Sequence, residues 1–319
     1  MSTALVTGAS GFVGGWLCRS LLADGWTVHG TTMHERDRSP ADGLDSVVWH
    51  AGDLASGVDV DVVRRAVDAA APDVIFHLAG ISFVPAAGDD PVSALSANAG
   101  VAVRVLEAAR RSGAESKRFP RVLLVGSAEQ YGRHDVKDLP LTEQSPMLAR
   151  TFYGVTKMAQ EEFGFMYHRT YGLPVVATRS FNHSGPGHSP RFLLPALVER
   201  IREARRVGSD VIRIGNGSAV RDYLHVKDVV RAYRALAAVG VPGEAYNVCS
   251  GKGVSVSELA AEVLAAAGSS ASLQRDPALE RTIDVEALIG DNAKLRAATG
   301  WSPKFSRTDI ISDLLDAAS

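Results

Sequence analysis

Thr7-Gly8-Ala9-Ser10-Gly11-Phe12-Val13-Gly14 decides the fold, because this stretch joins a short strand-like run, Ala4 to Thr7, to a helical pattern. Glycines between a strand and a helix indicate a phosphate-binding turn. Gly8 and Gly11 allow a tight turn and close approach of the backbone to a pyrophosphate, and Gly14 allows the helix to pack on the strand. We therefore expect a dinucleotide to bind at Gly8, Gly11, Phe12, Val13 and Gly14.

Strand-like and helical segments continue to alternate as far as residue 180. The expected strands are Ala4 to Thr7, Thr27 to Thr32, Val47 to His50, Val74 to Ala79, Arg121 to Gly126 and Val175 to Arg179. Regular alternation implies crossover connections and a parallel sheet with helices on both faces. We predict an α/β fold with a Rossmann-type, doubly wound parallel sheet, whose ligands bind beyond the carboxyl ends of the strands.

The alternation loosens after Phe181, which indicates a smaller mixed α/β lobe. The elements expected there are helices near 195–206, 226–239 and 257–267, and strands near 211–214 and 245–248. We predict that residues 1–180 form the dinucleotide-binding domain, that residues 181–319 form a substrate-binding lobe, and that a segment around 224–248 returns to the first domain.

The composition narrows the class of partner. The 319 residues are 46% hydrophobic and 22% charged, with a formal net charge of −2, so the chain has no general attraction to nucleic acid or to an anionic membrane. Cys18 and Cys249 show no C-x-x-C spacing and no nearby histidine pair, and we expect no metal. No run of about eighteen apolar residues occurs, so we expect a cytoplasmic protein that binds small molecules or other subunits.

The end of the second expected strand bears on the choice of dinucleotide. Thr32 stands where NAD-binding proteins place an acid that grips the adenosine ribose. A small neutral residue there, followed by His34, Arg36 and Arg38, tolerates a 2′-phosphate. We predict that NADP(H) is preferred, and NAD(H) stays possible because Glu35 lies nearby.

Two later strand ends are expected to face the same ligand. Asp53 and Leu54 follow the third strand and suit the adenine amino group. Leu78, Ala79 and Gly80 follow the fourth strand and allow a close backbone pass beside the cofactor.

The segment Tyr153-Gly154-Val155-Thr156-Lys157 places a phenol and an ammonium on one face of a helix. A fixed positive charge favours the phenolate, so we expect Lys157 to lower the pKa of Tyr153 toward working pH. Ser127 ends the fifth strand, at the same sheet edge as the dinucleotide. We predict that Tyr153 exchanges a proton with a substrate oxygen, that Ser127 donates a hydrogen bond to that oxygen, and that Lys157 also holds the nicotinamide ribose.

These motifs together resemble those of the extended short-chain dehydrogenases/reductases, the NAD-dependent epimerase/dehydratase family, which act on nucleotide-linked sugars. Within that family the chain is most similar to the GDP-6-deoxy-D-mannose reductases. The matching stretches, spread over nearly the whole chain, are Arg179 to Gly187, Gly215-Asn216, Ala219 to Tyr223, Tyr246 to Gly251, Leu288 to Gly290 and Thr299 to Trp301. The resemblance implies NAD(P)H-dependent reduction of the C4 keto group of a nucleotide-linked 4-keto-6-deoxy sugar. GDP-4-dehydro-6-deoxy-D-mannose is the favoured substrate and GDP-D-rhamnose the product.

The resemblance also assigns residues and an assembly. Asn182 would reach the sugar diphosphate, Arg221 and Arg281 would neutralise phosphate oxygens, and Arg213 would contact the base or ribose; Asp222 has the alternative role of anchoring its own loop. The remaining positions that it implies are Phe181 beside the cofactor and Ser82, Glu129, Arg191 and Asn216 beside the substrate. A homodimer would form through helices near 91–112 and 152–171.

Other activities stay open at this point. Glu129 stands two residues after Ser127, where 4,6-dehydratases of the family place a glutamate that takes the C5 proton. Dehydratases of the dTDP-glucose type also carry an acid directly after the Ser/Thr, and here that residue is Ala128, so reduction is the first interpretation. An epimerase with tightly bound cofactor is the second. A non-catalytic cofactor-binding protein is the third, and the intact Ser127, Tyr153 and Lys157 argue against it. The stretches 81–88 and 279–286 depart from the family's pattern, which leaves the sugar and the base open.

Overall fold

The computed structural model describes residues 2–34, 43–56, 62–280 and 285–317. Its largest element is a seven-stranded sheet in which every neighbouring pair of strands is parallel. The strands across the sheet are β3 (Val48–Ala51), β2 (Thr27–Thr32), β1 (Thr3–Thr7), β4 (Val74–His77), β5 (Arg121–Ser127), β6 (Val175–Ser180) and β10 (Ala245–Val248). The order reverses between β1 and β4, which is the doubly wound arrangement. The predicted fold class is confirmed.

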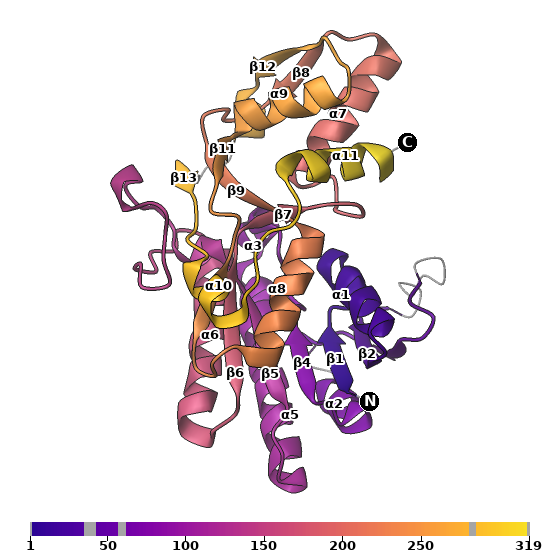
Figure 1. Ribbon diagram of the computed structural model, residues 1–319, viewed down its shortest axis with the longest axis vertical. Coiled ribbons are helices and arrows are strands. Elements are labelled where there is room, and N and C mark those ends of the chain that lie inside the picture. The colour runs from indigo at the N-terminus through magenta and orange to yellow at the C-terminus, as the bar shows by residue number, and fades with distance from the viewer. Residues whose placement is uncertain (1, 35–42, 57–61, 281–284, 318–319) are drawn as a thin grey trace.

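Helices cover both faces of this sheet (Figure 1). One face carries α1 (Phe12–Ala23), α8 (Val226–Val239) and α10 (Ala293–Thr299), and the other carries α2 (Val62–Ala70), α5 (Val101–Ser116) and α6 (Phe152–Tyr171). Each layer has its own apolar core: Leu17 of α1 and Tyr233 of α8 belong to one, and Val63 of α2 and Val105 of α5 to the other. These apolar faces hold the strand ends in fixed positions.

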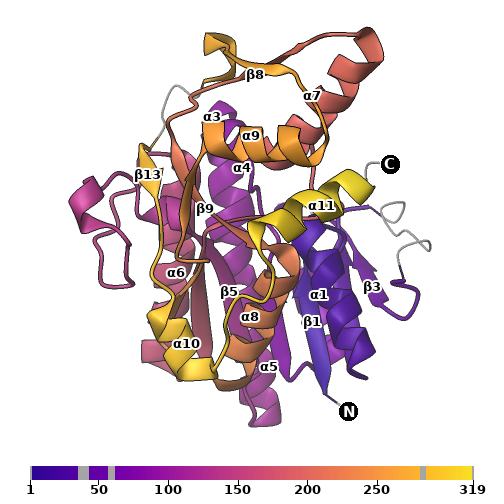
Figure 2. The same cartoon turned by 45° about the horizontal axis from the view of Figure 1, so that its top comes forward.

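A smaller lobe lies beyond the carboxyl edge of the sheet (Figures 1 and 2). It contains α7 (Leu193–Val207), β8 (Val211–Ile214), α9 (Val256–Ala266), β12 (Ser272–Arg275), the short turn η6 (Pro277–Leu279) and α11 (Arg307–Ala317). Apolar residues recur at helical spacing on α7, and Leu197 and Ile201 pack in one core with Leu259 and Val263 of α9. Between this core and the large sheet, β9 (Val220–His225) pairs with β7 (Asn182–Ser184), β11 (Gly253–Ser255) and β13 (Ala287–Leu288).

The short strands β7 and β9 were not foreseen. No strand was expected directly after Phe181, whereas Asn182–Ser184 forms β7, which is paired with β9 from about forty residues later in the chain. A three-residue strand shows no alternation of polar and apolar positions that a pattern could reveal. Pairing with β9 orders β7 as a strand instead.

The helix expected near 91–112 is also interrupted. After α3 (Val84–Asp89), the chain forms α4 (Pro91–Leu95), a π-helical turn η3 (Ser96–Gly100) and then α5. In η3 the Asn98 side chain bonds to both backbone groups of Ile81. Two single-turn elements complete the first 150 residues, η4 (Ala128–Gln130) and η5 (Val136–Asp138).

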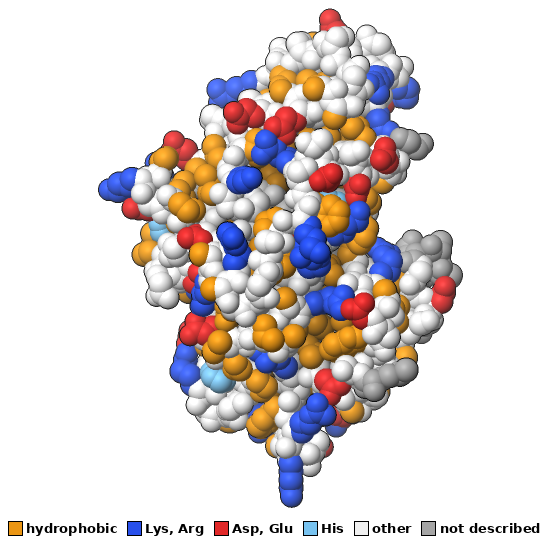
Figure 3. Space-filling view, in the orientation of Figure 1, with side chains coloured by type: hydrophobic (Ala, Val, Ile, Leu, Met, Phe, Trp, Pro, Cys, Tyr) orange, Lys and Arg blue, Asp and Glu red, His pale blue; other side chains and the backbone are white. Residues whose placement is uncertain are grey.

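Residues Pro91–Ser116 are long and apolar enough to cross a membrane, but half of their most apolar window is buried inside the fold. There α5 packs on α2 and α6, as a core helix does. On the face in Figure 3, Lys and Arg side chains are scattered among Asp and Glu side chains.

Candidate active site

A cavity of about 670 Å³ opens at the carboxyl edge of the large sheet. The ends of β1, β2, β4, β5 and β6 line it from one side, and β7, β9 and α7 from the other. The sequence-predicted residues that line it are Gly8, Gly11, Phe12, Val13, Gly14, Thr32, Asp53, Leu54, Leu78, Ala79, Gly80, Ser82, Ser127, Glu129, Tyr153, Lys157, Phe181, Asn182 and Arg221. The fold therefore gathers the expected cofactor and catalytic residues around one space.

Three predicted substrate residues do not line this cavity. The Arg213 side chain is 69% exposed and pairs with Asp276, because Ile212 and Ile214 take the buried positions of β8. Arg191 is exposed on the turn before α7, and Asn216 bonds within its own turn, to Ser218. Arg36 and Arg281 lie outside the described residues.

The glycine-rich turn is shaped to admit a phosphate group. Gly8 has φ +72°, and a Cβ on Gly14 would stand 2.2 Å from the Gly8 carbonyl oxygen, so neither position tolerates a side chain. α1 begins after Gly11 with no side-chain cap. A bare helix N-terminus beside a tight backbone turn fits the pyrophosphate of a dinucleotide.

At the end of β2 the described residues offer hydroxyl groups. Thr32 is buried, and its Oγ1 lies 3.1 Å from both Ser10 Oγ and the His34 carbonyl oxygen. The two residues that follow, Met33 and His34, are neutral or weakly basic. Thr32, Met33 and His34 therefore place no carboxylate at the end of β2.

The loop after β3 is held in place by α5. Asp53 accepts a hydrogen bond from the Ala55 amide, and Arg104 donates to the carbonyl oxygens of Leu54 and Ser56 at 2.6 and 2.8 Å. Arg104 was not identified from the sequence, where it reads as one of several polar positions on a helix.

Asn98 is a second residue that the sequence did not reveal. Its side chain bonds to Ile81 and to the Thr156 hydroxyl, and a Cβ on Gly80 would meet its Oδ1 at 2.3 Å. Asn98 thus ties the loop after β4 to the helix that carries Tyr153. Only the interrupted helix around it, visible in three dimensions, marks it.

Ser127, Tyr153 and Lys157 lie together on the floor of the cavity, from β5 and α6. The expectation that Tyr153 has a lowered pKa is wrong for this structure: burial raises the pKa of Tyr153 to about 12, a hydrogen bond with Ser127 opposes this, and Glu129 adds to it. The physical reason is the burial of the phenol, which penalises its charged form; Lys157 Nζ donates to the Val125 carbonyl oxygen and to Gln160, each at 2.9 Å. Tyr153 is therefore a protonated phenol at neutral pH, which suits a proton donor.

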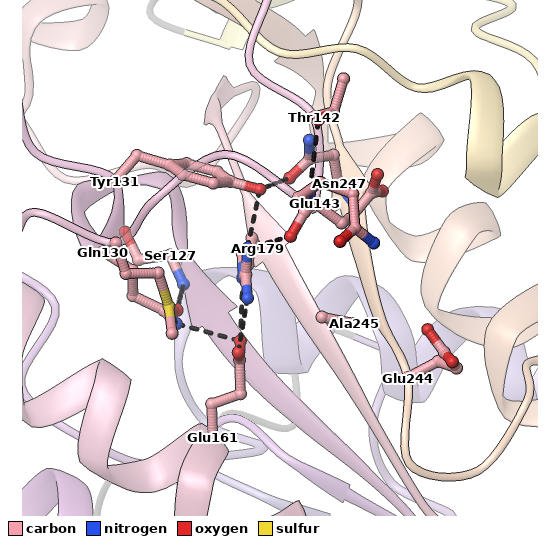
Figure 4. Close-up of polar contacts among 12 residues, drawn as sticks. Ser127, Gln130, Tyr131, Thr142, Glu143, Glu161, Arg179, Glu244, Ala245 and Asn247 are labelled. Carbon is pink, nitrogen blue, oxygen red and sulfur yellow. Dashed lines mark hydrogen bonds and ion pairs between the residues drawn. The ribbon is translucent and has the colours of Figure 1, made fainter. Parts of the chain in front are cut away.

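A buried network of hydrogen bonds holds the Ser127 backbone in place (Figure 4). The Ser127 amide donates to Gln130 Oε1 at 2.9 Å, and Gln130 Nε2 donates to Glu161 at 3.0 Å. Glu161 in turn accepts two hydrogen bonds from Arg179 at 2.7 and 3.1 Å, in an ion pair whose side chains are 3% and 7% exposed. Because Glu161 follows Lys157 by one helical turn, this network joins β5, β6 and α6.

Aromatic rings line the cavity near the glycine-rich turn. The His188 ring stacks at 4.4 Å between centroids on Phe12 on one side and on Phe192 on the other, and Phe83 meets Phe192 edge to face. Histidines and a phenylalanine in a loop give no signal in a sequence, because only the fold brings them to Phe12.

Comparison with known proteins follows this geometry. A model of the family "GDP-mannose 4,6 dehydratase" matches residues 5–314. The chain belongs to that family. Its members are extended short-chain dehydrogenases/reductases of the epimerase/dehydratase type, and the predicted family is confirmed.

One relative and two solved structures illustrate the range of activities near this member of the GDP-mannose 4,6-dehydratase family. GDP-6-deoxy-D-mannose reductase of Pseudomonas aeruginosa is 30% identical over 304 residues, 94% of this chain and 92% of the relative. The solved structure of RMD from Pseudomonas aeruginosa complexed with NADPH has a TM-score of 0.82 and 27% identity, covering 99% and 98% of the two chains. Thermus thermophilus UDP-glucose 4-epimerase, solved with NAD, has a TM-score of 0.86 and 27% identity, covering 98% of each. The chain is thus a nucleotide-sugar-modifying enzyme of this family.

Proposed function

We propose that the chain is an NAD(P)H-dependent 4-reductase of a nucleotide-linked 4-keto-6-deoxy sugar, with NADPH and a GDP-linked sugar favoured. The observation that carries the proposal lies at the end of β5. Ser127 and Tyr153 both line the cavity, and the residue after Ser127, Ala128, carries a buried methyl group that cannot donate a proton. A dehydratase of the dTDP-glucose type needs an acid there to assist loss of water, so the arrangement supports reduction.

The geometry suggests how the residues act. The glycine-rich turn would hold the pyrophosphate of the dinucleotide, and a bound nicotinamide would supply the hydride to the sugar C4. The Tyr153 hydroxyl, protonated because of its burial, would give its proton to the C4 oxygen, while Ser127 donates a hydrogen bond to that same oxygen. Donors already in place stabilise the developing alkoxide by roughly a few kcal/mol each.

The substrate side of the proposal rests on fewer residues. Arg221 is 8% exposed on β9 and lines the cavity with Asn182 of β7. A guanidinium beside an amide suits the diphosphate of a nucleotide sugar. Family membership alone does not decide four further parts of this proposal. These are GDP as the nucleotide, GDP-D-rhamnose as the product, a homodimer and a cytoplasmic location.

A 4-epimerase is the second candidate, favoured by the likeness to the UDP-glucose 4-epimerase solved with NAD. The same three catalytic residues would oxidise and re-reduce C4, with the cofactor retained. Net consumption of NADPH separates the two activities, because an epimerase consumes none.

NADPH absorbance should therefore be followed with 4-keto-6-deoxy sugars linked to GDP, UDP, dTDP and CDP, and each product weighed by mass spectrometry. The proposal expects oxidation with one of them and a product heavier by two hydrogens. The Tyr153→Phe variant should lose most of this oxidation. Tyr171→Phe, a change at the half-exposed end of α6, is its matched control and should behave as wild type. No oxidation with any of the four sugars would contradict a reductase.

A further inference from the structure

Gln160 is a buried amide with no role in the proposed reaction. It lies on α6, one helical turn after Lys157, and is 1% exposed. Its Oε1 accepts a hydrogen bond from Lys157 Nζ at 2.9 Å, and its Nε2 donates to the Val125 carbonyl oxygen at 3.0 Å. Both ends of the amide are therefore committed to the surroundings of one ammonium group.

Val125 completes a closed set of three hydrogen bonds. Its carbonyl oxygen, on β5, also accepts from Lys157 Nζ at 2.9 Å. Lysine has three N–H donors, and these two bonds use two of them. Because Lys157 lines the cavity, one donor is left to act there, and its direction is set by the other two.

We propose that Gln160 is a positioning residue that fixes the Lys157 ammonium between α6 and β5, so that its remaining N–H points to the ribose of the dinucleotide. The inference rests on the proposed function only in that a nicotinamide dinucleotide binds the cavity. It concerns how this chain holds its lysine, whichever sugar is the substrate.

Gln160 should also affect the pKa of the Lys157 ammonium group. Burial lowers the pKa of Lys157 to about 8, and the Gln160 carbonyl oxygen accepts a stronger hydrogen bond from the charged ammonium than from the neutral amine. The other titratable groups around the lysine are Tyr153 on the same helix, Glu129 in η4 beside Tyr153, and His77 of β4, whose pKa burial and the lysine charge lower to about 3. Tyr153 and His77 are neutral near pH 7, so changes at residue 160 should be felt directly by the ammonium.

Two near-isosteric changes should act in opposite directions. Gln160→Met removes the acceptor, which disfavours the charged amine and lowers its pKa, whereas Gln160→Glu brings a carboxylate to the ammonium and raises it. The dissociation constant of NADPH is read from NADPH fluorescence between about pH 6 and 10. In the wild type it should rise, as binding weakens, above a midpoint near pH 8. That midpoint should move down by about one unit in Q160M and up by about one unit in Q160E. Gln274→Met, at an exposed glutamine, is the control and should not move it.

Midpoints that stay at the wild-type value in both variants, or move in the same direction, would overturn the role of Gln160. Thermal melting reports whether each variant is folded. If either variant does not fold, Gln160→Asn is used in its place. Its amide is one methylene too short to reach Lys157, so it should shift the midpoint as Q160M does. Failure of the one part of the proposed function that this inference uses, dinucleotide binding, looks different, because the wild-type protein would then bind neither NADPH nor NADH.

Discussion

The two sides of the cavity differ in how firmly their functional residues are held. On the sheet side, Tyr153 and Lys157 stand on a long helix whose Glu161 is bonded to Gln130 and Arg179. On the lobe side, Arg221 is buried on a six-residue strand, whereas Arg213 is exposed on a separate two-stranded sheet. Rigid packing fixes the residues for which we propose the chemistry, and short strands carry those for which we propose recognition of the nucleotide.

The largest effect is expected on the rigid side, from Tyr153→Phe. This change removes the proton that the C4 oxygen should receive and leaves the ring in place. Turnover should fall by about 10²- to 10⁴-fold, while the dissociation constant of NADPH changes little. Turnover within a few-fold of wild type, measured by NADPH oxidation, would remove Tyr153 from the reaction.

Glu161→Gln tests how much the buried ion pair contributes to the free energy of unfolding. The change leaves the Arg179 guanidinium buried without its counter-charge, and unfolding in urea should show a loss of roughly 3–5 kcal/mol. Glu162→Gln is the matched control, because the neighbouring Glu162 side chain is 66% exposed and pairs at the surface with Arg169. Equal stability of the two variants would contradict the importance of the buried pair.

On the lobe side, Arg221→Ala and Arg213→Ala should differ. Arg221 faces the cavity, so its loss should weaken nucleotide-sugar binding by about 10- to 100-fold in calorimetry. Arg213 pairs only with Asp276 in the described structure and its loss should have little effect. The reverse order would mean that the substrate nucleotide lies over β8.

The pH profile should reveal the lysine. Burial lowers the pKa of Lys157 from 10.5 to about 8, so the charged form is lost as the pH rises through 8, whereas Tyr153, with a pKa of about 12, keeps its proton there. kcat/KM should therefore fall about tenfold per unit above that pH. An alkaline limb above pH 10 would argue that the lysine is not the titrating group.

The smallest effect concerns the adenosine end. Thr32 and Ser10 present hydroxyls where an acid would repel a 2′-phosphate, so NADPH should give a several-fold higher kcat/KM than NADH. A strong preference for NADH in steady-state kinetics would show that an acid outside the described residues reaches the ribose.

The sequence predicted the parts of this enzyme that local patterns encode. The strand ends at Thr7, Thr32 and Ser127 follow from alternation, and the Tyr153–Lys157 face follows from helical spacing. Asn98, Gln160 and the stack on His188 could not be found in this way, because each has at least one partner far away in the chain. The lowered pKa expected for Tyr153 failed for a related reason: helical spacing cannot show how deeply the fold buries the phenol, and burial raises the pKa of Tyr153.

The most direct test of the central claim uses NADPH deuterated at both C4 positions of the nicotinamide, with the GDP-, UDP-, dTDP- and CDP-linked 4-keto-6-deoxy sugars in turn. A reductase transfers one deuterium to the sugar C4 and one proton from Tyr153 to the oxygen, so the product should be heavier than the keto sugar by about three mass units. A product of unchanged mass, or one lighter by a water, with no deuterium gained and no NADPH consumed, would contradict the account.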